Sequence, residues 1–136
     1  MGRAARFPFV SIVIANHNGA QWLPRCLNAV FAQSVSDFEV IVVDDASSDH
    51  SADHLENEWP GVRVLRLAKP LNFAAANNRG VQLAQGEWLA LLNNDAFPNP
   101  DWLEKLLKAA SDQEDYSCFA SCMVQFKAPD RLDNTG

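Results

Sequence analysis

Three clusters of oxygen-bearing side chains follow apolar stretches of this chain, and together they could hold a metal ion and a phosphate group. The clusters are Asn16-His17-Asn18, Asp44-Asp45 and Asn93-Asn94-Asp95. The last one is the clearest, because the apolar run from Trp88 to Leu92 stops abruptly before it. In an open parallel sheet, ligands bind beyond the carboxyl ends of the strands, so we expect these clusters to share one edge.

Metal-assisted phosphate binding is the chemistry that suits these side chains. A pocket with several carboxylates and few cations does not hold a diphosphate unaided, because like charges repel strongly where water is scarce. Mg²⁺ or Mn²⁺ removes this difficulty by taking one or two carboxylates from the protein and completing its octahedron with phosphate oxygens and water. Asp95 is the expected metal ligand. Asp44 and Asp45 suit a second task, accepting from a nucleobase N–H or from ribose hydroxyls.

The segments that must position these clusters alternate between strand and helix. The stretch 9–15 is apolar on both faces, as in a central strand covered by helices on each side. Asn99 is expected to cap the last helix, with Pro100 at its first position. Gly80 indicates a close approach or a kink inside a helix. Strands are predicted at 9–15, 38–43, 62–67, 88–92 and 118–126, and helices at 21–31, 51–59, 73–85 and 101–110, with 62–67 near a sheet edge.

This order predicts an α/β fold, a doubly wound and mainly parallel sheet with helices on both faces. The 136 residues, 48% of them hydrophobic, suit one domain at 9–136 after a flexible tail at 1–8. The net charge of −6 argues against a nucleic-acid partner. Cys26, Cys118 and Cys122 are interpreted as reduced core residues of a cytoplasmic protein. No apolar run approaches the roughly 18 residues that span a bilayer.

An ordered set of segments resembles glycosyltransferase family 2, the inverting nucleotide-sugar transferases. The matching segments are VSIVIANHN, FEVIVVDDASSD, FAAANNRGVQLAQGEWLALLNNDAFPNPDWLEKL and the closing PDRLDNTG. The resemblance implies the GT-A fold, a nucleotide-diphospho-sugar donor, Mg²⁺ or Mn²⁺ as cofactor, and a glycan or lipid-linked acceptor. It also implies that this chain is the N-terminal, donor-binding part of a longer enzyme, with its catalytic base beyond Gly136. The full-length protein would lie in the cytoplasm, in peripheral contact with the inner face of a membrane, and could be oligomeric.

The family pattern also implies roles for single residues. His17 takes the place of an aromatic residue, often Tyr, that lies near the base. Asp45 would receive the base N–H and Asp44 would lie close to the nucleoside. Asn94-Asp95 would form the metal-binding DXD motif, with Asp95 as the principal ligand. The expected donor-binding residues are Ala15, Asn16, His17, Asn18, Asp44, Asp45, Asn78, Asn93 and Asn94, and at position 72 this chain has Asn72 where relatives often carry Gly or a basic residue.

Other interpretations of the same residues stay open. The chain could be a non-catalytic nucleotide-sugar-binding or assembly module. A receiver-like signalling domain would need acidic residues after its first strand and an aspartate after its third, where this chain has Asn16-His17-Asn18 and Ala68-Lys69-Pro70. No G-x-G-x-x-G follows the first strand, which argues against a dinucleotide-binding enzyme. Structural interpretations are a helix-capping turn at 44–48, a turn at 93–95, an exposed helix face at 77–79, and surface positions for His50, His54, Asp112, Glu114, Asp115 and Asp130.

Overall fold

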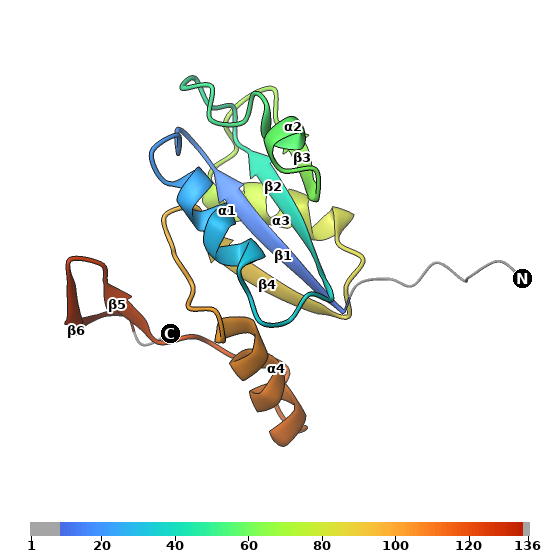
Figure 1. Cartoon of the computed structure of the whole chain (residues 1–136). Coiled ribbons are helices and arrows are strands. Elements are labelled where there is room, and N and C mark those ends of the chain that lie inside the picture. The colour runs from blue at the N-terminus through green and yellow to red at the C-terminus, as the bar shows by residue number, and fades with distance from the viewer. Residues whose placement is uncertain (1–8, 135–136) are drawn as a thin grey trace, which may run out of the picture.

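A four-stranded parallel sheet with helices on both faces forms the body of the protein (Figure 1). The computed structural model describes residues 9–134, so the predicted flexible tail at 1–8 lies outside the described residues. The strand order is β3-β2-β1-β4. The doubly wound α/β fold predicted from the alternation of strands and helices is therefore confirmed. The elements are β1 (Val10–Asn16), α1 (Leu23–Phe31), β2 (Phe38–Asp44), α2 (Leu55–Glu58), β3 (Val62–Arg66), α3 (Phe73–Leu83), β4 (Trp88–Asn93), α4 (Trp102–Asp112), β5 (Met123–Gln125) and β6 (Ala128–Asn134).

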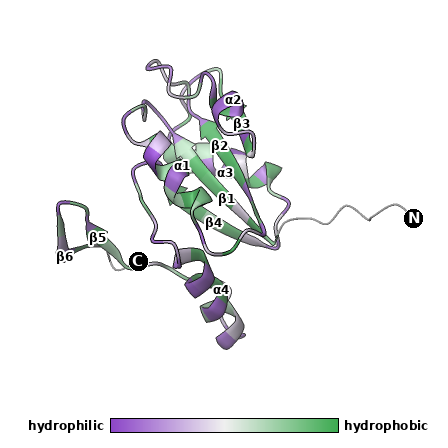
Figure 2. Ribbon diagram, in the orientation of Figure 1, coloured by the Kyte–Doolittle hydropathy of each residue, from purple (hydrophilic) through white to green (hydrophobic). Residues whose placement is uncertain are grey.

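The strand β1 is central and buried on both faces, as its composition predicted (Figure 2). Successive side chains of a strand point to opposite faces, so β1 contributes to two cores. Ile12 and Ile14 belong to the core beneath α1 and α2, whereas Val13 belongs to the core beneath α3. Gly80 of α3 lies directly on this second core, because an added Cβ would overlap Val13 Cγ1 and approach Val43 Cγ2 to 2.8 Å. The predicted close approach at Gly80 is confirmed.

A carboxylate fastens the amino ends of the strands, at the end of the sheet away from the polar clusters. Glu39 Oε1 accepts from Ser11 Oγ at 2.6 Å and from the Gln85 N–H at 2.7 Å. Its Oε2 accepts from Arg63 at 2.9 Å. Burial raises the pKa of Glu39, but the hydrogen bonds from these three partners outweigh it and hold the pKa below its ordinary value of 4.5. Glu39 therefore contributes most to stability in its charged form.

Replacing Glu39 by Gln is expected to lower the free energy of unfolding at pH 7 by about 1–3 kcal/mol, the range for a hydrogen-bonded charged group. Because the folded-state pKa is depressed, this contribution is full above the unfolded-state pKa and disappears as the pH falls through the folded-state pKa. Urea unfolding at a series of pH values measures it. The difference between Glu39→Gln and the parent should shrink below about pH 4.5, the ordinary Glu value. A matched change at the exposed Glu114 should show no such pH dependence.

The structure differs from the sequence-based expectations most strongly after β4. The apolar segment predicted as a strand at 118–126 does not join the main sheet. Only 123–125 of it is a strand, and this pairs antiparallel with β6, for which the sequence analysis predicted no strand. In Figure 1 this hairpin stands beside the body of the protein rather than within its sheet. Cys118 and Cys122 lie before it and are exposed, so their placement in the core is wrong, whereas Cys26 is buried as predicted.

Two helix boundaries and one strand also differ. The helix predicted at 51–59 is helical only over α2, after a turn at 51–54. The N-cap of α4 is Asp101, so Asn99 does not cap it and Pro100 lies outside it. The prediction of a buried strand at 88–92 is wrong on one face, because Leu89 and Leu91 are 48% and 56% exposed.

Within residues 9–134, none of the helices has the length and apolarity needed to cross a bilayer.

Candidate functional site

Asn16, the last residue of β1, joins the polar ends of three neighbouring segments. Its side chain is fully buried, with 0% exposure. Its Nδ2 donates to Asp44 Oδ1 at 3.1 Å and to Ser51 Oγ at 2.8 Å, and its Oδ1 accepts from Asn94 Nδ2 at 2.8 Å. The register explains this, because Asn16 lies opposite Asp44 on one side and Ala15 opposite Asn93 on the other. The structure therefore brings the three sequence-predicted clusters to one edge of the sheet.

Gly19 is needed for this arrangement, and the sequence analysis missed it. A Cβ at this position would overlap both Asn16 Oδ1 and Asn94 Nδ2, the two atoms of the hydrogen bond that links β1 to the Asp95 loop. Gly19 thus lies against that hydrogen bond and leaves room for it. The available signal was a glycine directly after the polar cluster that ends the first strand.

Asp44 serves mainly to fix the turn that follows β2. Its side chain is 6% exposed and accepts from Asn16, from Ser47 Oγ at 2.6 Å and from the Ser47 N–H at 3.3 Å. Ser47 Oγ in turn accepts from the Asn18 N–H at 2.9 Å. Asp44 thus fixes the chain after β2 and lies near the other clusters, but 44–48 caps no helix, because α2 begins only at Leu55 with His54 as its N-cap. The helix-capping interpretation is wrong.

Asp45 lies at the wall of a pocket of about 440 Å³ lined by His17, Asp45, Pro70, Leu71 and Asn72. Its two oxygens accept from the Leu71 N–H at 2.7 Å and from the Asn72 N–H at 3.0 Å. These bonds hold the connection between β3 and α3 against the end of β2. Each carboxylate oxygen keeps a further lone pair, so Asp45 can accept another donor from the pocket.

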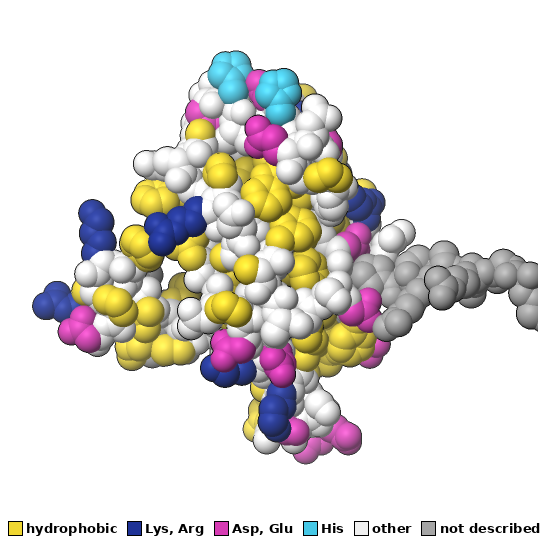
Figure 3. Space-filling view, viewed as in Figure 1, with side chains coloured by type: hydrophobic (Ala, Val, Ile, Leu, Met, Phe, Trp, Pro, Cys, Tyr) yellow, Lys and Arg dark blue, Asp and Glu magenta, His cyan; other side chains and the backbone are white. Residues whose placement is uncertain are grey.

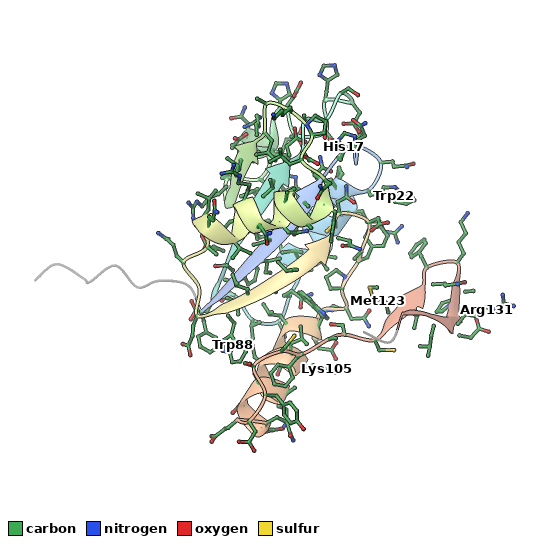
Figure 4. The ribbon with its side chains drawn as sticks, turned by 180° about the vertical axis from the view of Figure 1, so that it is seen from behind. His17, Trp22, Trp88, Lys105, Met123 and Arg131 are labelled. Atoms are coloured by element: carbon green, nitrogen blue, oxygen red, sulfur yellow. The ribbon has the colours of Figure 1, made fainter. Side chains whose placement is uncertain are left out.

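His17 lines the same pocket, and its hydrogen bonds define its tautomer. Nδ1 lies 2.7 Å from the backbone oxygen of Asp45, which can only accept, so Nδ1 carries the proton. Nε2 lies 3.3 Å from Asn18 Nδ2 and is then the acceptor in the neutral ring. Figure 4 shows His17 near the carboxyl end of β1, on the same end of the molecule as Trp22. The imidazole is thus held in one orientation beside Asp45, with an exposed ring.

Three non-glycine residues around this site, Asn18, Ala46 and Asn72, have positive φ angles that L-amino acids seldom adopt. Asn72 has φ 81° and ψ 167°, a region populated almost entirely by glycine. Its Oδ1 accepts from the Ala75 N–H at 3.2 Å and caps α3, which offsets part of the strain. Ala46 has φ 53° and has no side chain that could form such a hydrogen bond. Strained backbone therefore lies on two sides of Asp45, at the next residue, Ala46, and at Asn72, whose N–H donates to the Asp45 carboxylate.

Replacing Ala46 by Gly is expected to raise the free energy of unfolding by about 0.5–1 kcal/mol, because glycine adopts positive φ without steric cost. Thermal and urea unfolding would measure the change. The matched control is Ala74→Gly at an exposed position of α3, which should destabilise by up to about 1 kcal/mol because the backbone there is helical. Equal losses at both positions would contradict the assignment of strain to Ala46.

Asp95 is exposed and forms no ion pair with any residue between 9 and 134. It follows Asn94, which Asn16 fixes in place. The nearby Cys26 does not compete as a ligand, since burial and the charge of Asp95 raise the pKa of its thiol to about 12. No group of three or more His, Cys, Asp or Glu side chains within 9–134 could hold a metal ion. A metal here would therefore take fewer than three such ligands from residues 9–134, and its remaining ligands would be phosphate oxygens and water, as Mg²⁺ and Mn²⁺ accept.

The remaining predicted residues are less directly connected to this edge. Asn93 is exposed beside Asp95, and Ala15 packs partly against the core under α3. Asn78 is exposed on α3, and its neighbour Asn77 is the one that turns inward and donates to the backbone oxygen of Phe73. His50 and His54 are exposed, as expected for surface residues, and His50 lies 2.8 Å from Asp53.

The fold matches solved transferase structures. The structure of S. aureus TarS 1-349 superposes with a TM-score of 0.71 at 19% identity, covering 85% of this chain and 39% of that one. The mannosyltransferase PcManGT from Pyrobaculum calidifontis superposes with a TM-score of 0.71 at 24% identity, covering 79% of this chain and 34% of that one. These matches define the architecture as the GT-A type, as predicted.

Sequence comparison identifies the family. The glycosyltransferase AglE of Haloferax volcanii is 35% identical over 103 residues, which are 72% of this chain and 34% of AglE. The chondroitin synthase of Pasteurella multocida is 32% identical over 117 residues, which are 83% of this chain and 12% of that enzyme. The family model described as "Glycosyl transferase family 2" matches residues 11–133. The chain therefore belongs to this family. It spans about a third of AglE, so its segments correspond to only part of such an enzyme.

Proposed function

We propose that this chain binds a nucleotide-diphospho-sugar for glycosyl transfer, with the nucleoside in the pocket beside Asp45 and the diphosphate on a divalent ion held by Asp95. The hydrogen-bonded series Asn94–Asn16–Asp44 carries this proposal, because it holds the Asp95 loop next to the pocket edge. TarS is described in complex with UDP and with UDP-GlcNAc, and PcManGT with GDP-Man and Mn²⁺, which supports a donor and a metal of these classes.

Each residue of the site has a distinct task in this proposal. His17 presents an exposed ring on which the base can pack, at the place of the family's aromatic residue. Asp45 accepts the base N–H with the lone pairs that Leu71 and Asn72 leave. Asp44 and Asn16 fix the turns and Asn94 orients the loop, while Ala15, Asn18, Asn78 and Asn93 complete the donor-binding set.

The transfer proposed is inverting displacement at the anomeric carbon. A metal bound at Asp95, Mg²⁺ or Mn²⁺, would neutralise charge on the departing nucleoside diphosphate. The acceptor would be a glycan or a lipid-linked glycan. This proposal assigns the carboxylate that takes its hydroxyl proton to none of the late acids, of which Glu114, Asp115 and Asp130 are exposed and Asp112 pairs with Lys108. The full-length enzyme would act in the cytoplasm, at the inner face of the membrane.

Calorimetry with UDP, GDP and dTDP, each with and without Mn²⁺, tests the donor part of this proposal. We expect one nucleotide to bind more tightly in the presence of Mn²⁺. Addition of EDTA, which chelates the ion, should remove this gain in affinity. Binding of all three with equal affinity, unchanged by metal, would refute it. An assay of sugar transfer on the chain and on a longer parent then separates a catalytic domain from a binding module.

A further inference from the structure

The guanidinium of Arg25 lies in the corner formed by two aromatic rings from distant parts of the chain. Its Cζ lies 4.5 Å from the ring centroid of Phe97 and 4.2 Å from that of Phe126. Phe97 belongs to the segment between β4 and α4, and Phe126 to the turn between β5 and β6. The two rings also contact each other edge to face, with centroids 5.5 Å apart. Helix α1 is thereby joined to the β5–β6 hairpin through one cation.

The two rings contact this guanidinium from adjacent directions, at a steep angle to each other, and leave its other sides open. No hydrogen bond or ion pair joins Arg25 to any other residue in the described part of the chain. Within residues 9–134, Arg63, Arg66, Lys105 and Lys108 pair with carboxylates, whereas Arg25 has no ion pair, as is also the case for Lys69, Arg79, Lys127 and Arg131. Contact with two rings restricts the position of this exposed guanidinium, so an anion beside it would meet a better-ordered partner than at a free surface arginine.

The surroundings of Arg25 suit a carbohydrate. Trp22 is 38% exposed and packs 6.3 Å from the Phe97 ring, and Phe126 is 58% exposed. These rings offer apolar surface on which the C–H face of a sugar can lie. In Figure 3 hydrophobic side chains gather on the hairpin and on the neighbouring part of the body. Phe97 is two residues after Asp95, so this surface adjoins the proposed metal position.

We propose that Arg25 binds an anionic group, a carboxylate or a phosphate, of a carbohydrate that lies on Trp22 and Phe126. The planar guanidinium fork matches both groups by two parallel N–H···O bonds. That this carbohydrate is the molecule receiving the sugar rests on the proposed function. Binding of the anion at Arg25 is independent of the proposed function, because Arg25 does not line the pocket at Asp45 and its contacts are with Phe97 and Phe126.

The test follows the ¹⁵N signal of the Arg25 side-chain N–H in this chain during titration with glucuronate, glucose 1-phosphate and glucose. We expect one or both anions to shift the signal, and the neutral glucose to leave it unchanged. A response to glucuronate alone assigns a carboxylate ligand, and a response to glucose 1-phosphate alone assigns a phosphate ligand. No shift with either anion, or an equal shift with glucose, would overturn the proposal.

Variants separate the anion site from a merely structural contact. Calorimetry, which does not depend on the Arg25 signal, should show that Arg25→Gln weakens binding of the responding anion about tenfold, as for a charge-assisted hydrogen bond, and that Phe126→Leu weakens it while keeping the cation. Lys127→Gln, at an exposed cation of the same hairpin, should leave it unchanged. Persistent binding in Arg25→Gln overturns the proposal.

A repeat with saturating UDP and Mn²⁺ should give the same shift, whereas competition would place the anion in the donor pocket and also overturn it. Failure of UDP to bind would affect only the proposed function.

Discussion

The variant Asp95→Asn is expected to lose about 100-fold or more of the Mn²⁺-dependent affinity for the nucleotide, since even residues that only support metal ligands cost 10–100-fold. The amide keeps the size of the side chain but removes its negative charge. Asp95 belongs to no group of three or more metal-ligating side chains within residues 9–134 that could hold the ion without it. Calorimetry with and without Mn²⁺ measures the loss.

Stability should hardly change in this variant, because the Asp95 side chain is exposed and has no ion pair within residues 9–134. Thermal unfolding therefore serves as the internal check that Asp95→Asn is folded. Asp115→Asn removes a different exposed carboxylate and should bind nucleotide and Mn²⁺ as the parent does. Unchanged metal dependence in Asp95→Asn would remove Asp95 from the proposed site.

Replacing Asn16 by Ala should produce the largest loss of stability among the site residues, about 2–4 kcal/mol. Its side chain is fully buried and bonds to Asp44, Ser51 and Asn94, so truncation leaves buried polar groups without their partners. Metal-dependent nucleotide binding should weaken as well, because Asn94 and the loop that carries Asp95 lose their link to β1.

Urea unfolding measures the first effect and calorimetry the second. Asn28→Ala, at an exposed position on α1, is the matched control and should change stability by less than about 0.5 kcal/mol. A variant Asn16→Ala as stable as Asn28→Ala would show that the hydrogen bonds of Asn16 contribute little. Stability loss without loss of binding would mean that the Asp95 loop is held by other contacts.

Sequence patterns predicted the sheet and its functional edge because both depend on local chemistry. Between Val10 and Ala15, Ser11 is the one polar residue of β1, so neither face of this strand is suited to solvent. This explains the central place of β1 in the sheet. Polar residues follow directly after the strands, so their convergence needed only the parallel order of the strands. The weak alternation at 62–67 likewise indicated an edge strand, and β3 is one.

Features that depend on distant contacts were not predictable in this way. The apolar residues at 118–126 have the composition of a core strand, yet they lie outside the sheet, with Cys118 and Cys122 exposed. The role of Gly19 becomes visible only when the positions of Asn16 and Asn94 are known. The role of Arg25 likewise depends on its contacts with Phe97 and Phe126, which are distant in the sequence. The expectation for Asp45 stays a proposal, and the structure adds the two backbone N–H groups that orient it.

The free side of β4 has a consequence for handling the isolated chain. Within residues 9–134, β4 pairs only with β1, and Leu89 and Leu91 are exposed on one of its faces. A strand edge with unsatisfied backbone groups beside apolar side chains is a template for intermolecular pairing and aggregation. Aggregation of the isolated chain should therefore increase steeply with protein concentration, and Leu91→Lys should suppress it.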